Sequence, residues 1–144
     1  MRINFSKLDF EFFTKPLLVG GKAMEYYNLR KSGKDVDLIV TSEDYERLVE
    51  KYPEHTKDIF GDLGVCIHGF EIWRWICKFD YGFLSRNALE EENIKVIHLE
   101  KLLFMKALGI SKEKYEEDVK LIVQKIFDIQ YGKNKDFKPD YLVQ

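Results

Sequence analysis

The chain has 144 residues, which fits one domain that can bury a core without disulfides or a structural metal. Hydrophobic residues make up 45% and charged residues 33%, a balance typical of a globular protein rather than a disordered one. The formal net charge of −2 lacks the basic excess of proteins that coat nucleic acid, although a local basic patch is compatible with it.

Cysteine and histidine spacing argues against a zinc site. Cys66 and Cys77 are eleven positions apart, and the three histidines are scattered. Two free thiols suit a reducing compartment. No apolar run approaches the roughly 18 residues of a membrane span, and no signal-peptide core follows the N-terminus. We therefore expect a cytoplasmic protein without a membrane-spanning segment.

The first half of the chain alternates helix and strand patterns. Apolar spacing and turn residues predict helices over residues 6–13, 22–29 and 42–52, and strands over residues 17–19 and 35–40. Thr41 with Asp44 fits a capping-box start for the third helix, and Pro53 closes it.

The second half predicts further strands and then two helices. Residues 59–69 are expected to form a strand or irregular hairpin, residues 70–79 a strand and residues 94–97 a short strand. Apolar and amphipathic helices are expected over residues 99–108 and 113–129. The fold class is therefore α/β (α+β), a small mixed sheet flanked by helices. Within a single domain, residues 1–144, we expect the core over about 16–98, a helical C-terminal part over about 99–130 and a loose tail over 132–144.

Two carboxylates on the predicted second strand are the first candidate for chemistry. Asp35 and Asp37 are two positions apart, so both are expected on one face, with Cα atoms about 7 Å apart. Like charges held there repel unless a cation neutralises them, and Mg²⁺ binds one or two carboxylates together with substrate phosphates. The alternative is a solvated outer face, which is the more common reason for such a pair taken alone.

Two glycines follow the predicted first strand. Gly20 and Gly21 let the backbone turn sharply and let a phosphate approach the start of the next helix. The alternative is an ordinary strand-to-helix turn. The segment matches neither the Walker phosphate-binding loop nor the dinucleotide-binding fingerprint.

Taken together, the glycines and the aspartates resemble a known superfamily. Leu17-Leu18-Val19-Gly20-Gly21-Lys22-Ala23, followed by Arg30-Lys31-Ser32-Gly33-Lys34-Asp35-Val36-Asp37-Leu38, resembles the nucleotidyltransferase pattern of a hydrophobic residue, two small residues and a later acidic pair. The similarity is greatest to small bacterial and phage members related to AbiEii-type toxins and minimal nucleotidyltransferases. It covers about residues 16–125 and is dense only over 17–40.

The resemblance also implies the remaining site residues. A third carboxylate is expected on a strand beside the Asp-x-Asp strand; Glu71 is preferred, with Asp62 and Asp80 as alternatives. The resemblance implies that Gly20, Gly21, Lys22, Arg30, Lys34, Lys106 and Asp118 bind nucleotide or phosphate and that Asp35, Asp37 and Glu71 are catalytic and hold Mg²⁺, with Mn²⁺ as an alternative. The alternative for Arg30 and Lys34 is a solvated turn that binds no phosphate. The alternative for Lys106 and Asp118 is that both are solvated residues on helices. Trp73, Trp75, Tyr26 and Tyr27 are candidates for base stacking, although core packing is favoured for them. Arg74 alternates with the two tryptophans and is expected to be exposed or to cap the sheet.

Three functions are compatible with this pattern. The first is a Mg²⁺-dependent enzyme that moves a nucleoside monophosphate from an NTP to a hydroxyl of RNA such as tRNA, of a protein or of a small molecule, as a toxin or defence component. The second is a catalytically silent binding module of the same fold that regulates a partner protein or antitoxin. The third is a structural or phage accessory protein that retains only the fold.

Overall fold

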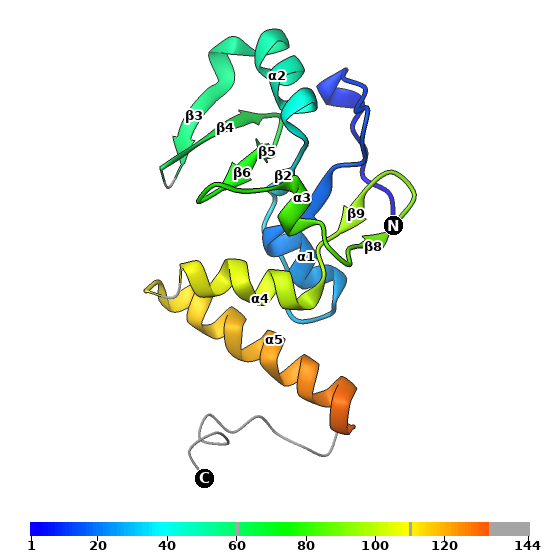
Figure 1. The fold of residues 1–144 in the computed structure, drawn as a ribbon, viewed down its shortest axis with the longest axis vertical. Helices are drawn as coiled ribbons and strands as arrows, with labels where there is room; N and C mark the ends of the chain where they lie inside the picture. Colours follow the sequence, from blue (N-terminus) through cyan, green and yellow to red (C-terminus); the bar gives the residue numbers. More distant parts are fainter. Residues whose placement is uncertain (60, 110, 133–144) are drawn as a thin grey trace. The chain divides into compact units, whose positions relative to one another are not determined.

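The computed structural model describes residues 1–59, 61–109 and 111–132. The chain divides into unit 1, residues 1–98, and unit 2, residues 99–144. In Figure 1, unit 1 runs from blue to yellow-green, and the described part of unit 2 runs on to orange. The division falls where the sequence predicts the sheet-containing core to end. Residues 133–144 of the predicted loose tail lie outside the described residues.

Unit 1 is built around a mixed sheet. Its strand order is β3-β4-β5-β2-β1-β9-β8, with β2–β5 and β1–β9 parallel and the other neighbours antiparallel. Figure 1 shows β3 and β4 at one end of this sheet and β8 and β9 at the other. The strands are β1 (Leu17–Val19), β2 (Val36–Ile39), β3 (Thr56–Ile59), β4 (Asp62–Ile67), β5 (Phe70–Trp73), β8 (Leu89–Glu90) and β9 (Lys95–Val96); β6 (Trp75–Ile76) and β7 (Phe79–Asp80) form a separate hairpin.

Helices complete both units, which confirms the mixed α and β fold class. Unit 1 contains α1 (Gly20–Tyr26), α2 (Ser42–Lys51), α3 (Tyr81–Leu84) and the 3₁₀ turns Ser6–Leu8 and Pro53–His55; unit 2 contains α4 (Leu99–Leu108) and α5 (Glu113–Tyr131). Among the helices described, none is both long and apolar enough to cross a lipid bilayer.

The core of unit 1 lies around the two central strands. All three residues of β1 are buried, and β2 buries Leu38 and Ile39 completely. A strand buried on both faces is a continuous apolar run, which explains why the short segment from Leu17 to Val19 forms the middle of the sheet. The rest of the sheet and its helices contribute the fully buried residues Leu8, Ala23, Met24, Leu48, Val65, Ile72, Leu84, Ile94, Val96 and Ile97.

A buried carboxylate ties the N-terminal segment to α2. Asp44 is fully buried; its two carboxylate oxygens accept hydrogen bonds from the backbone N–H groups of Phe13 (3.0 Å) and Thr14 (3.1 Å). The Arg47 guanidinium pairs with the same carboxylate at 2.8 Å. The Asp44 N–H donates to Thr41 Oγ1, so the predicted helix cap is confirmed.

Several predicted elements differ from the structure. The helix over residues 6–13 is wrong: only a 3₁₀ turn forms, and Asp9 at its end has φ 43°. Phe12 meets Phe5 and Phe10 edge-on there, so aromatic packing determines this segment. The helix after the glycines begins at Gly20 and ends at Tyr26 rather than Leu29.

The single strand over residues 70–79 is also wrong. The pairing of β5 ends at Trp73, and Cys77 and Lys78 both have positive φ, which makes the turn between β6 and β7. Neither residue type signals such a turn in a sequence. The sequence did not predict β3, β8 or α3, although residues 62–67 do form the expected strand, paired with β3 and β5.

Candidate functional site

The centre of the sheet brings two acidic residues side by side. Asp37 on β2 is the direct partner of Glu71 on β5, and Glu71 is in turn the partner of Cys66 on β4. Directly paired residues point to the same face, and neighbouring strands are about 4.8 Å apart. Asp37, Glu71 and Cys66 therefore form one row across the sheet, which we call the carboxylate row.

The thiol of Cys66 responds to the charge of this row. Burial raises the pKa of Cys66, the Glu71 carboxylate raises it further, and smaller effects of Asp35 and Asp37 act in the same direction, while Lys57 opposes them. Three carboxylates thus act on one thiol. No motif marks Cys66 in the sequence; the one available signal is its alternation with Asp62 and Gly64 along β4.

The turn between β1 and α1 lies against Asp37. Gly20 has φ +66°, and a Cβ atom built on it would stand 2.1 Å from Asp37 Oδ2, which is an impossible contact. Only glycine fits at this position. Gly21 differs, because a Cβ there would meet Ser32 Cβ at 3.4 Å and lie 3.7 Å from the Arg30 guanidinium. The structure therefore joins the glycine turn to the acidic strand, as the combined pattern predicts.

The predicted cationic residues lie on α1 and along the turn that follows it. The Lys22 ammonium is 3.9 Å from the Glu25 carboxylate, which also accepts a hydrogen bond from the Ser32 hydroxyl at 3.1 Å. Arg30 donates to the carbonyl of Lys31 and stands beside Gly21. Lys34 is exposed. Glu25 on α1 thus holds the turn, which carries Arg30 and Lys34, while Lys22 lies on α1 itself.

Asp35 does not share the strand with Asp37. β2 begins at Val36, whose N–H donates to the Gly69 carbonyl at 2.8 Å, and Asp35 is exposed just before it. Within residues 1–59, 61–109 and 111–132, no group of three Asp, Glu, His or Cys side chains is arranged to hold a metal ion. The arrangement fits a cation that takes one or two carboxylates from the protein and its other ligands from phosphate and water.

The two alternatives to Glu71 are engaged elsewhere. Asp62 Oδ2 accepts a hydrogen bond from the backbone N–H of Cys77 at 2.9 Å, and Asp80 caps α3 by accepting from the Phe83 N–H at 3.0 Å. Of the three acidic candidates, Glu71 is the one in register with Asp37.

Lys106 and Asp118 pair with each other inside unit 2. The ammonium and carboxylate are 3.0 Å apart, with 7% and 2% of the side chains exposed. The Lys106 ammonium also lies 4.8 Å from the centroid of the Tyr115 ring. This buried pair links α4 to α5, so the solvated alternative for these residues is wrong, and their predicted nucleotide contact stays a prediction.

The aromatic candidates for base stacking are mostly used in packing. Trp73 is 5% exposed, and the Tyr27 hydroxyl donates to the Ile97 carbonyl at 2.8 Å, with burial as the main cause that raises the pKa of Tyr27 to about 12. Tyr26 meets Tyr27 edge-on. Trp75 lies under the Arg74 guanidinium, 3.8 Å from the ring centroid. Core packing is thus confirmed for Trp73, and Tyr27 has a structural hydrogen bond.

The carboxylate row makes a prediction for thiol chemistry. In a Cys77→Ser background, Glu71→Gln removes the negative charge that acts most strongly on Cys66, so the alkylation profile of Cys66 should move to lower pH and labelling at pH 8 should become faster. The rate of iodoacetamide labelling against pH measures this. Glu92→Gln, at an exposed carboxylate paired with Arg2, is the control and should leave the profile unchanged. An unchanged alkylation profile in Glu71→Gln would contradict the position of Glu71 beside Cys66 in the carboxylate row.

Comparison of the chain with protein-family models, with curated proteins and with solved structures finds no match. The candidate site therefore consists of a glycine turn in contact with Asp37, a second carboxylate in register with it, and three cationic residues on α1 and the turn after it, namely Lys22, Arg30 and Lys34.

Proposed function

We propose that unit 1 carries a Mg²⁺-dependent nucleotidyltransferase site of the kind that the motif resembles. The observation that carries the proposal is the contact of Gly20 with Asp37, whose strand partner is Glu71. Two carboxylates on neighbouring strands repel each other in the absence of a cation. A glycine without a side chain at the same point leaves room for a ligand group close to the backbone.

Mg²⁺ fits the residues present. Asp37 and Glu71 would hold it, with Asp35 at the open end of β2, and oxygen ligands from phosphate and water would complete the coordination. When bound, the ion would neutralise charge on the phosphates and lower the pKa of an attacking hydroxyl. Mn²⁺ suits the same oxygen ligands.

The remaining residues supply binding and orientation. Arg30 and Lys34, with Lys22, present positive charge to a triphosphate, and a guanidinium can bind phosphate oxygens in bidentate fashion. Glu71 is placed to accept a proton from the acceptor hydroxyl or to orient it. The product would be an acceptor carrying the nucleoside monophosphate, with release of pyrophosphate. An RNA such as tRNA, a protein or a small molecule could serve as acceptor, and a toxin or defence role in the cytoplasm follows from the resemblance.

Labelled-NTP transfer tests the proposal. Each of the four NTPs, labelled on the α-phosphate, is incubated with the full chain, Mg²⁺ and either tRNA or a cell lysate. Wild type should transfer label, and Asp35→Ala/Asp37→Ala should not, because the cation then keeps only the Glu71 carboxylate. Glu92→Gln is the matched control, since it removes an exposed carboxylate that pairs only at the surface with Arg2. Equal labelling by wild type and the double variant would contradict the enzyme hypothesis.

One observation favours a second candidate, a binding module without turnover. The described residues contain no three-ligand metal group, and Asp35 stands outside the strand. A protein of this kind would bind a partner protein or antitoxin. Two measurements separate the candidates. In a pull-down with EDTA present, a binding module retains its partner. In a Mn²⁺ titration followed by electron paramagnetic resonance, the enzyme binds Mn²⁺ and Asp37→Asn loses this binding.

A further inference from the structure

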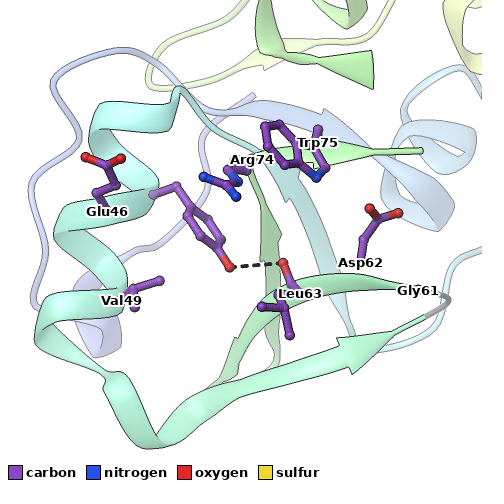
Figure 2. A pocket seen from close by; sticks show the side chains of 8 residues that line it. Glu46, Val49, Gly61, Asp62, Leu63, Arg74 and Trp75 are labelled. Atoms are coloured by element: carbon purple, nitrogen blue, oxygen red, sulfur yellow. Dashed lines mark hydrogen bonds between the residues drawn. The ribbon is translucent and has the colours of Figure 1, made fainter. Parts of the chain in front are cut away.

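A separate pocket lies between α2 and the β3–β4 hairpin. Its volume is about 340 Å³, within the usual range for small-molecule sites. Figure 2 shows helix α2 along one side, the strand with Leu63 along another, and Arg74 and Trp75 closing the space between them. None of the carboxylates Asp35, Asp37 and Glu71 lines it.

The positive group of this pocket is Arg74. Its guanidinium stacks on the Trp75 ring at 3.8 Å and lies 5.6 Å from the centroid of the Tyr45 ring. No hydrogen bond or ion pair joins it to any residue that the structure describes, although its side chain is only partly exposed. A guanidinium that lies over one aromatic ring and near a second keeps its N–H donors available for a carboxylate.

The acidic groups of the pocket are Asp62 and Glu46. One carboxylate oxygen of Asp62 is fixed by the Cys77 N–H, which orients the other, and Figure 2 shows this side chain directed from β4 toward Trp75. Glu46 is exposed on α2 at the rim. One positive and two negative groups therefore surround the space, which disfavours a plain anion.

The rest of the wall is apolar and rigid. Val49 and Leu63 contribute aliphatic surface, and the Tyr45 hydroxyl is held by a 3.0 Å hydrogen bond to the Leu63 carbonyl, drawn as a dashed line in Figure 2. Tyr45 is thereby fixed between α2 and β4. Leu63 is 60% exposed, so its side-chain surface is available to a ligand.

We propose that this pocket binds a small zwitterion of the amino-acid class with an apolar or aromatic side chain. Arg74 takes its carboxylate, Asp62 takes its ammonium group, and Tyr45, Leu63 and Trp75 contact the side chain, while Glu46 lies on the opposite side of the pocket. The site is independent of the proposed nucleotidyl transfer and would persist if that proposal failed.

Three probes of one skeleton test the assignment by removing one charged group at a time. L-phenylalanine has both groups, 3-phenylpropionate lacks the ammonium, and phenethylamine lacks the carboxylate. Binding to the full chain is followed by the NMR signal of the Trp75 indole N–H, assigned with Trp75→Phe. We expect phenylalanine to saturate this shift with a Kd on the order of 1 mM, and the other two probes to bind several-fold more weakly.

Variants then separate the two ends of the ligand. Arg74→Gln should weaken phenylalanine and 3-phenylpropionate about tenfold and leave phenethylamine unchanged. Asp62→Asn keeps an acceptor for Cys77 and should weaken phenylalanine and phenethylamine only. Arg86→Gln is the control, because Arg86 lies over the Phe83 ring at 5.2 Å, outside the pocket. Arg74→Lys, which keeps the charge, should fall between wild type and Arg74→Gln.

Three results would overturn the proposal. They are no saturable shift up to about 20 mM phenylalanine, equal affinity for all three probes, and an affinity for phenylalanine that neither Arg74→Gln nor Asp62→Asn changes.

Discussion

Replacing Gly20 with alanine is expected to lower the free energy of unfolding by about 3 kcal/mol and to remove any cation binding at Asp37. The left-handed backbone costs about 1–2 kcal/mol for a residue with a side chain. The added methyl group would also stand 2.1 Å from Asp37 Oδ2, so the strand or the carboxylate must move. Overpacking of a core has a similar effect and costs about 1–3 kcal/mol. Urea unfolding measures the first effect, and Mn²⁺ titration of the folded protein measures the second.

The adjacent glycine supplies the control. Gly21→Ala places its methyl group 3.4 Å from Ser32 Cβ, which needs little adjustment, and Gly21 has no positive φ. Because alanine favours a helix by about 1 kcal/mol over glycine, Gly21→Ala should leave stability unchanged or raise it slightly. A Gly20→Ala protein as stable as Gly21→Ala would show that the turn does not press on Asp37.

Breaking the buried ion pair of unit 2 is expected to be the largest single loss there. Asp118→Ala leaves the Lys106 ammonium, 7% exposed, without its carboxylate, which costs about 3–5 kcal/mol. Hydrogen exchange measured peptide by peptide reports this within α4 and α5, because faster exchange in those helices reports their own opening. The exchange of β2 serves as the internal reference.

A double variant distinguishes charge burial from packing. Lys106→Met/Asp118→Leu removes both charges and keeps apolar volume, so protection in α4 and α5 should return to within about 1 kcal/mol of wild type. Lys120→Ala breaks only exposed pairs with Glu116 and Glu117 and should change protection by less than about 0.5 kcal/mol. A double variant as unstable as Asp118→Ala would mean that the ion pair itself stabilises the packing of α4 against α5.

The segment from Leu17 to Ile39 could be predicted from the sequence because local signals agree there. An apolar run, two glycines, a polar turn and an alternating strand each indicate the same order of elements, and the structure has β1, α1 and β2 in that order. The strand partner of Asp37 was predicted from the resemblance to a family. Its register with Glu71 depends on β5, which pairs in parallel with β2 across more than thirty positions of chain.

The features that could not be predicted depend on tertiary packing. The turn at Cys77 and Lys78 has positive φ without glycine, and Asp62 fixes it through the Cys77 N–H. At the end of the segment expected to be a helix, the Phe13 N–H donates to the Asp44 carboxylate, and the edge-on contacts of Phe12 with Phe5 and Phe10 pack the residues before it. The residues that line the pocket at Arg74 come from α2, β4 and β6, so the periodicity of any single segment does not predict the pocket.

The register between β2 and β5 has a consequence for how this protein can change by mutation. Side chains alternate along a strand, so a slip of one residue would turn Glu71 to the opposite face and bring Phe70 or Ile72 beside Asp37. The same slip would turn Ile72, which is now fully buried, to the opposite face of the sheet. The relative position of the two carboxylates therefore cannot change in small steps. A variant that folds with this sheet keeps Asp37 and Glu71 side by side.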